Sequence, residues 1–285
     1  MLTFATSARA NSDTITMRGD VATTGFLTVE GGSLYYETRG KGDVIILIHG
    51  GLVDSRIWDD QMESFAKTHR VVRYDLRGFG KSSAPAAKFS HVTDLYSLCR
   101  TLGITRANVI GVSLGGSIAM DFTLEHPEMV ESLSLVDSAL RGDVRPPDDR
   151  LQSIYRSSRS DGPQKFAEKM LSTPMFAGVP PEGLLRARML QMLAENAKAL
   201  TTFSLWLQPG YKTIDRLPDI KVPTLIVAGS SDHPDLLAIA DILHSRIPGS
   251  RKVIIPGASH HPNAEHAEEF NSVTLRFLRE SRSHR

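Results

Sequence analysis

A serine lies between two glycines in the stretch GVSLGG, residues 111–116, directly after a short β-branched run. A sharp turn from strand to helix holds its central residue at positive φ, and small neighbours let the strand and the helix approach each other. Gly111 and Gly115 meet this need around Ser113. The pattern G-x-S-x-G is typical of a nucleophile elbow, which raises a serine hydroxyl above the carboxyl ends of parallel strands. Ser113 is therefore the candidate nucleophile for acyl transfer.

A serine hydroxyl needs a base to take its proton, and the base needs an acid that fixes its tautomer and stabilises its charged form. In proteins with a nucleophile elbow the acid and then the histidine follow the serine along the chain. The run VPTLIVAGSSD leads a strand into Asp232, and VIIPGASH leads the last strand into His260. Both residues should lie at the sheet edge that carries Ser113. The neighbouring His261 can titrate equally well and remains an alternative base.

Eight short runs rich in apolar and β-branched residues predict the strands that position these side chains. The stretch FLTVEGGSLYYETRG supplies two strands joined at Gly31-Gly32. Continuous apolar runs, typical of strands buried on both faces of a parallel sheet, follow at 44–49, 71–75, 108–112, 133–137, 224–229 and 252–256. Helical patterns alternate with them at 57–67, 92–102, 114–125, 235–246 and 264–278. The predicted fold class is α/β, a mostly parallel eight-stranded sheet flanked by helices.

The stretch from Arg141 to Asp215 interrupts this alternation because it contains amphipathic segments and no convincing strand. We therefore expect a helical cap subdomain over residues 141–215, inserted between the sixth and seventh strands, and a core formed by residues 25–140 and 216–285. The cap is rich in methionine and aromatic residues, which either pack between its own helices or contact the substrate. The candidate substrate-lining residues of the whole chain are Trp58, Met175, Met189, Trp206 and His261.

The composition fits one globular unit that acts on a small, roughly neutral ligand. The 285 residues carry 33 basic and 32 acidic side chains, a net charge of +1 that favours neither nucleic acid nor a membrane surface. The single cysteine, Cys99, can form no internal disulfide, so a reducing cytoplasm is the expected location. No apolar run approaches the roughly 18 residues that cross a bilayer. The oligomeric state stays open.

Residues 1–24 are rich in Ser, Thr and Ala, and no continuous apolar core follows their basic residues. A secretory signal is therefore not expected. We expect a mobile N-terminal extension over this range, or translation that begins at Met17.

Four motifs together resemble the α/β-hydrolase superfamily, in its esterase, enol-lactonase and haloperoxidase-like branch. The resemblance extends from about Phe26 to Phe277 and is carried by LIHGG at 47–51, YDLRGFGKS at 74–82, GVSLGG at 111–116 and PGASHHPNAE at 256–265. Their shared order and spacing identify the chain as a member of this superfamily. The resemblance implies an enzyme that cleaves small carboxylic esters or lactones through an acyl-enzyme.

The resemblance also implies a role for each matching residue. It makes Ser113 the nucleophile, Asp232 the orienting acid and His260 the base, and it leaves Asp137 as the alternative acid because some relatives place it there. The oxyanion would be held by the backbone N–H groups of Gly51 and Leu114. The supporting residues implied around them are His49, Gly50, Gly111 and Gly115, with Trp58 packed beneath the oxyanion loop.

Other activities on the same fold remain open at this point. A cofactor-free perhydrolase or haloperoxidase would use the same triad, a carbon–carbon bond hydrolase is a close relative, and a ligand receptor or signalling protein could retain the fold. A serine nucleophile argues against haloalkane dehalogenases and epoxide hydrolases, which place an aspartate there. No HExxH pairing and no G-x-G-x-x-G after the first parallel strand occur, so we expect no metal and no cofactor.

Overall fold

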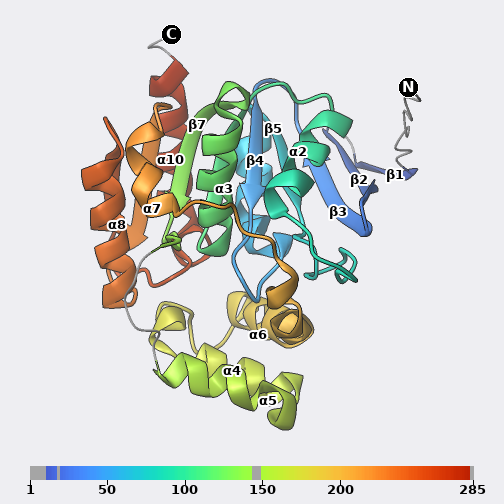
Figure 1. The fold of residues 1–285 in the computed structure, drawn as a ribbon, viewed down its shortest axis with the longest axis vertical. Helices are drawn as coiled ribbons and strands as arrows, with labels where there is room; N and C mark the ends of the chain where they lie inside the picture. Colours follow the sequence, from blue (N-terminus) through green and yellow to red (C-terminus); the bar gives the residue numbers. More distant parts are fainter. Residues whose placement is uncertain (1–10, 18–19, 143–148, 283–285) are drawn as a thin grey trace.

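The computed structural model describes residues 11–17, 20–142 and 149–282 and contains one mixed sheet flanked by helices (Figure 1). The strand order is β1-β2-β3-β5-β4-β6-β7-β8-β9. The first three strands and the β3–β5 pair are antiparallel, and all other pairs are parallel. The strands are β1 Asn11–Met17, β2 Asp20–Val29, β3 Gly32–Arg39, β4 Val44–Ile48, β5 Arg70–Tyr74, β6 Ala107–Val112, β7 Val130–Val136, β8 Thr224–Gly229 and β9 Arg251–Ile255. The predicted α/β fold class is confirmed.

The sheet has one strand more than the eight that the sequence predicts, because part of the expected mobile extension joins it. Residues 11–17 form β1, which pairs antiparallel with β2 from Asn11 opposite Phe26 to Met17 opposite Asp20. The β-branched residues of NSDTITM and DVATT favour extended backbone, and antiparallel pairing supplies its hydrogen bonds. Residues 1–10 and 18–19 of the expected extension lie outside the described residues.

Two layers of helices cover the central strands, which are buried on both faces. Helices α2, α3 and α8 pack on one face, and α1 and α10 pack on the other (Figure 1). Every residue of β6 is buried, as its continuous apolar run predicts. The helices are α1 Asp59–Ala66, α2 His91–Thr101, α3 Leu114–Glu125, α7 Thr213–Arg216, α8 Pro234–Arg246, α9 Pro262–Glu265 and α10 Ala267–Arg282. None of the described helices is long and apolar enough to cross a membrane.

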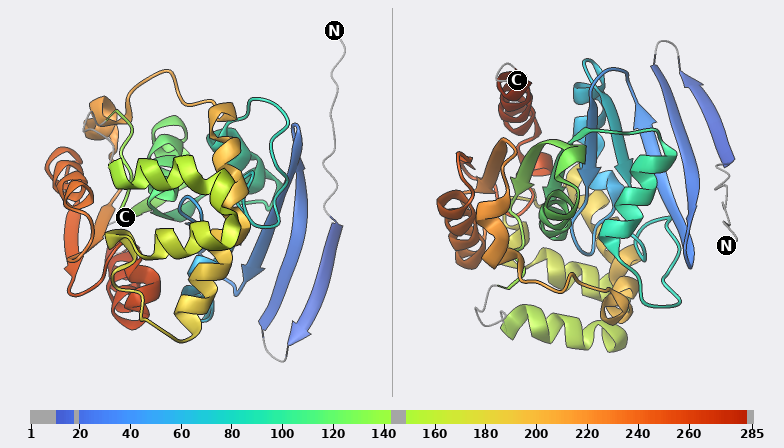
Figure 2. Two further views of the ribbon diagram at one scale, coloured as in Figure 1. Left: turned by 90° about the horizontal axis from the view of Figure 1, so that it is seen from below. Right: turned by 45° about the horizontal axis from the view of Figure 1, so that its top comes forward.

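The segment between β7 and β8 is helical and lies across the carboxyl ends of the strands (Figures 1 and 2). These cap helices are α4 Asp149–Asp161, α5 Pro163–Leu171, η3 Pro174–Phe176, α6 Leu184–Asn196, η4 Ala197–Thr201 and η5 Phe203–Leu205. The chain then returns along the core, where α7 contacts α3. Residues 143–148 of the predicted 141–215 insert lie outside the described residues.

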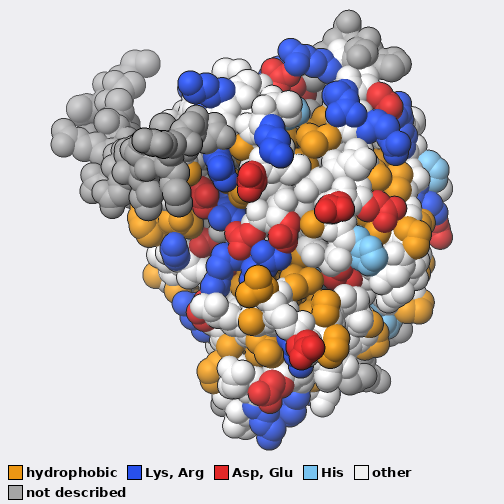
Figure 3. Space-filling model, turned by 180° about the vertical axis from the view of Figure 1, so that it is seen from behind, with side chains coloured by type: hydrophobic (Ala, Val, Ile, Leu, Met, Phe, Trp, Pro, Cys, Tyr) orange, Lys and Arg blue, Asp and Glu red, His pale blue; other side chains and the backbone are white. Residues whose placement is uncertain are grey.

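The face of the described chain seen from behind mixes charges of both signs (Figure 3). Acidic and basic side chains lie among apolar ones across this face. This distribution matches the net charge of +1 that the sequence gives.

Candidate active site

Ser113 lies in a strained turn between β6 and α3. Its backbone has φ 53° and ψ −115°, a conformation that non-glycine residues adopt only when the surrounding structure enforces it. A Cβ at Gly111 would overlap the carbonyl oxygen of Gly115, and one at Gly115 would overlap that of Ile48. Both glycines are therefore required for the tight approach of strand and helix. The turn places Ser113 at the positive end of the α3 dipole.

His260 and Asp232 form a buried pair at the same edge of the sheet. Nδ1 of His260 lies 2.8 Å from Oδ2 of Asp232, and the two residues are 2% and 5% exposed. Burial alone would raise the pKa of Asp232, but the charge and the hydrogen bond of His260, with the amide of His233, hold that pKa below its ordinary value. Nε2 of His260 is buried and has no hydrogen-bond partner within the described part of the chain. His260 thus has one nitrogen fixed by an acid and the other available to a reacting group.

The loop that carries His260 is held by the cap and by a half-buried carboxylate. The amide of His260 donates to the Met175 carbonyl (3.2 Å), and the Ser259 hydroxyl accepts from the Gly178 amide (3.0 Å). Glu265 accepts from the Ser259 amide (2.5 Å) and hydroxyl (2.8 Å). Burial raises the pKa of Glu265 above its ordinary value. We call these contacts of Met175 and Gly178 with the loop at 259–260 the histidine junction.

The loop after β4 lies against the nucleophile turn. A Cβ at Gly50 would lie 3.3 Å from Cβ of Ser113, and one at Gly51 would lie 3.9 Å from Cδ2 of Leu114. Among the described residues, neither the Gly51 amide nor the Leu114 amide donates to a backbone carbonyl. These are the two N–H groups that the family resemblance assigns to the oxyanion. Free backbone amides beside a serine are the donors that stabilise a developing oxyanion.

His49 fixes the conformation of this loop as a neutral side chain. Its Nε2 accepts from the Leu76 amide (2.8 Å), so Nδ1 carries the proton and donates to the Gly50 carbonyl (2.7 Å). Burial lowers the pKa of His49, which keeps the ring neutral. The supporting role of His49 stays a prediction, and these two hydrogen bonds are what such a role requires.

A second junction joins the cap to the oxyanion loop through one amide side chain. Asn196 is fully buried at the end of α6. Its Nδ2 donates to Oδ2 of Asp54 and to the Met192 carbonyl (both 2.9 Å), and its Oδ1 accepts from the Gly80 amide (2.7 Å). We call this set the oxyanion junction. Sequence reasoning missed Asn196, because no motif marks a residue 142 positions from its partner.

The candidate substrate-lining residues fall into different surroundings. Met175 lies at the histidine junction, and beside it the His261 ring stacks on Phe176 with centroids 5.2 Å apart. Trp58 and Met189 are fully buried in the apolar cluster that joins the core to the cap helices. Trp206 is half-buried, with its ring edge-on to His91 at 5.2 Å. Substrate contact stays a prediction for all five.

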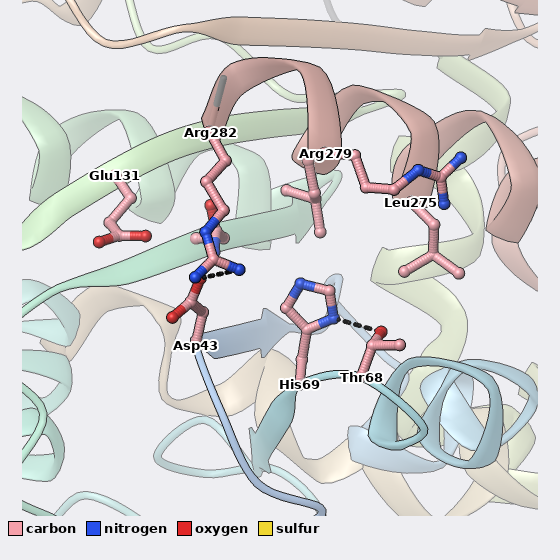
Figure 4. A pocket seen from close by; sticks show the side chains of 9 residues that line it. Asp43, Thr68, His69, Glu131, Leu275, Arg279 and Arg282 are labelled. Carbon is pink, nitrogen blue, oxygen red and sulfur yellow. Dashed lines mark hydrogen bonds and ion pairs between the residues drawn. The ribbon is translucent and has the colours of Figure 1, made fainter. Parts of the chain in front are cut away.

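A cavity of about 250 Å³ lies at the opposite end of the sheet, at the amino ends of the strands (Figure 4). Arg282 pairs with Asp43 at 3.2 Å, and Nδ1 of His69 lies 2.8 Å from the Thr68 hydroxyl. These polar groups are satisfied by each other. The cavity is separate from the site around Ser113. No group of three His, Cys, Asp or Glu side chains among the described residues could hold a metal ion.

Comparisons with known proteins agree with this architecture. A model of the alpha/beta hydrolase fold family matches residues 43–267. A 2-hydroxy-6-oxononadienedioate/2-hydroxy-6-oxononatrienedioate hydrolase from Paraburkholderia phymatum is 30% identical over 94% of this chain and 99% of its own length. A putative non-heme chloroperoxidase from Synechocystis is 30% identical over 86% of this chain and 94% of its own. The enol-lactonase of Burkholderia xenovorans superposes with a TM-score of 0.76 at 27% identity, over 89% of this chain and 99% of that one. The chain belongs to the α/β-hydrolase family.

Proposed function

We propose that this protein is a serine hydrolase that cleaves small carboxylic esters or lactones through an acyl-enzyme. The buried pair of His260 and Asp232, with Nε2 of His260 left without a partner, carries the proposal. His260 takes the proton of Ser113 as its oxygen forms a bond to the carbonyl carbon, and the amides of Gly51 and Leu114 hold the oxyanion. His260 then protonates the leaving alcohol, and it later activates the water that releases the acid.

The charge arrangement around the site supports a neutral substrate. Arginines follow three of the strands at this edge, and each is paired with a carboxylate: Arg56 with Asp54, Arg77 with Asp94, and Arg141 with Asp121. A buried substrate carboxylate would need a cation of its own. These three guanidinium groups are already occupied, which favours esters and lactones over dicarboxylate substrates.

Turnover of a graded series of p-nitrophenyl esters by the purified protein tests the proposal. We expect turnover of short acyl chains, and a loss on the order of 10⁴-fold or more in Ser113→Ala. The matched control is Ser97→Ala, which should keep wild-type rates. Ser97 is a half-buried serine on α2 whose hydroxyl donates to the Thr93 carbonyl. Equal rates in Ser113→Ala and the wild type, or no turnover of any ester or lactone, would overturn it.

Carbon–carbon bond hydrolysis is the second candidate, because the Paraburkholderia relative at 30% identity is named as a hydrolase of a 2-hydroxy-6-oxo dienedioate, which is not an ester. A vinylogous diketone substrate distinguishes it from ester hydrolysis. Perhydrolysis is distinguished by peracid-dependent oxidation measured beside ester turnover. For the location we propose the cytoplasm, a proposal supported by the single cysteine, Cys99, which is a buried free thiol.

A further inference from the structure

Two buried carboxyl groups, those of Asp137 and Asp232, lie at the turn after Gly229, within reach of a hydrogen bond to each other, and the carboxyl group of Asp232 contacts His260. They follow the neighbouring parallel strands β7 and β8. The Asp137 amide donates to the Val227 carbonyl (2.9 Å), and the Asp232 amide donates to the Gly229 carbonyl (3.1 Å). The two residues are 1% and 5% exposed. The backbones of two paired strands therefore bring both carboxyl groups to the turn at Gly229.

A hydrogen bond between two carboxyl groups requires a proton on one of them, because ionised carboxylates only accept. Asp232 accepts from the His260 ring (2.8 Å) and from the His233 amide (2.7 Å). Asp137 accepts from the Gly229 amide alone among the described residues, at 3.1 and 3.2 Å. The negative charge is better stabilised on Asp232. The shared proton therefore belongs to Asp137.

The other titratable groups facing this pair strengthen the assignment. His260 and His261 face it from the loop after β9, Glu265 lies at the end of α9, and His233 lies at the start of α8. Burial, the charge of Asp232 and the more distant Glu265 raise the pKa of Asp137 well above its ordinary value. Within the described part of the chain, no cation contacts Asp137 to oppose this effect.

The turn that carries Asp137 also holds the nucleophile. The Ser113 amide donates to the Val136 carbonyl (2.9 Å), and the Ala139 amide donates to the Ser113 carbonyl (3.0 Å). Asp137 itself has φ 37°, a left-handed conformation that aspartate and asparagine tolerate better than most residues. One turn thus touches both the backbone of the nucleophile and the carboxyl group behind the acid.

We propose that Asp137 is a positioning residue that stays protonated at neutral pH and donates its carboxyl proton to Asp232, which keeps Asp232 aligned with His260. The inference rests on the proposed function only for its kinetic test. It assigns different roles to two aspartates that the sequence offers as alternative acids of the triad. Asp232 carries the charge that orients the base, and Asp137 holds that charge in place.

Asp137→Asn and Asp137→Ala test the proposal through kcat/KM of ester hydrolysis across pH. Asparagine is neutral, fits the same backbone and keeps an N–H donor for Asp232. Its kcat/KM should therefore stay within about threefold of the wild type. The pH at which kcat/KM falls on the acid side of the profile, the acid limb, should not move. Alanine loses the donor to a charged acceptor, and kcat/KM should fall about 10- to 100-fold. Thermal unfolding of both variants controls for folding.

Three outcomes would overturn the proposal. A fall on the order of 10⁴-fold in Asp137→Asn would make Asp137 the acid that orients the base. An acid limb lowered by about one pH unit in Asp137→Asn would show that Asp137 carries a charge, since removing that charge lowers the pKa of the base. Equal rates in the wild type, the asparagine variant and a folded alanine variant would leave Asp137 with a packing role alone.

A measurement that needs no turnover separates this inference from the proposed function. In protein labelled at the aspartate carboxyl carbons, NMR should show one carboxyl resonance that stays protonated from about pH 5 to pH 8, above the ordinary pKa of aspartate near 4. That resonance should be missing from Asp137→Asn. The comparison of the wild type with Asp137→Asn therefore tests the proposal even when Asp137→Ala fails to fold. If no ester is cleaved but this resonance is found, the proposed function fails and the protonation of Asp137 stands. A resonance that titrates near pH 4 would overturn the inference.

Discussion

The cap helices meet the core at two junctions built from different chemistry. At the histidine junction the cap contributes backbone groups, the Met175 carbonyl and the Gly178 amide. At the oxyanion junction the cap contributes one side chain, that of Asn196. Backbone groups survive most side-chain substitutions, whereas a buried amide side chain is lost in a single substitution. The histidine junction is therefore sensitive to steric crowding, and the oxyanion junction is sensitive to charge.

The largest effect is expected from Asn196→Asp, which replaces an amide donor by a carboxylate 2.9 Å from Oδ2 of Asp54. Two buried like charges should lower the free energy of unfolding by about 3 kcal/mol at pH 8, measured by urea denaturation. The pKa of the new acid would be raised in the folded state. The loss should therefore be complete at high pH and shrink as the pH falls toward 5, where the protonated acid can donate again.

Two further variants control this prediction. Arg188→Ala, also on α6, removes ion pairs to the partly exposed carboxylates of Asp59 and Asp60 on α1 and should cost less than about 1 kcal/mol. Adding Asp54→Asn to Asn196→Asp again pairs one amide donor with one carboxylate. The double variant should therefore recover part of the lost unfolding free energy. If the double variant loses more stability than the two single variants lose together, charge repulsion is not the cause.

A smaller effect is expected from Gly178→Ala at the histidine junction. A Cβ there would collide with Oε2 of Glu265 and lie 3.0 Å from the Ser259 amide. Crowding of this kind should cost about 2 kcal/mol of unfolding free energy. It should also displace the loop of His260 and lower kcat/KM about tenfold or more, since small misplacements of catalytic groups are costly. Gly210→Ala, where a Cβ meets open space, is the control. Wild-type kinetics in Gly178→Ala would show that the junction does not position His260.

At neutral pH the smallest effect is expected from His261→Phe, because its consequence is a change in how the unfolding free energy depends on pH. Burial and the neighbouring His260 lower the pKa of His261 to about 3. A histidine with a lowered folded pKa stabilises the protein fully above its unfolded value near 6.5, and this contribution is lost as the pH falls toward 3. Phenylalanine keeps the ring stack on Phe176 without titrating. Unfolding free energy in the variant should fall less steeply below pH 6.5, by up to about 1.4 kcal/mol per pH unit. Parallel curves for the two proteins would contradict this.

The central strands and the nucleophile turn could be predicted from the sequence because local pattern determines them. The continuous apolar run of β6 ends at Gly111 and Val112, and the glycines on both sides of Ser113 are dictated by steric contact. Pattern alone did not distinguish β1 from a mobile extension, since polar residues of an edge strand give little apolar signal. Sequence reasoning also missed the hydrogen bond between Glu265 and Ser259, although both residues lie within the motif PGASHHPNAE.

The sequence by itself determined the candidate residues Ser113, Asp232 and His260, because their order and the strand before each are readable from local residue types. Only the tertiary structure decided which aspartate contacts the histidine, since Asp137 and Asp232 both follow strands and differ only in their neighbours in space. The contacts of Asn196 with Asp54 and of Gly178 with Ser259 were decided in the same way. Hydrogen bonds and burial depend on residues distant along the chain, and no local pattern records them.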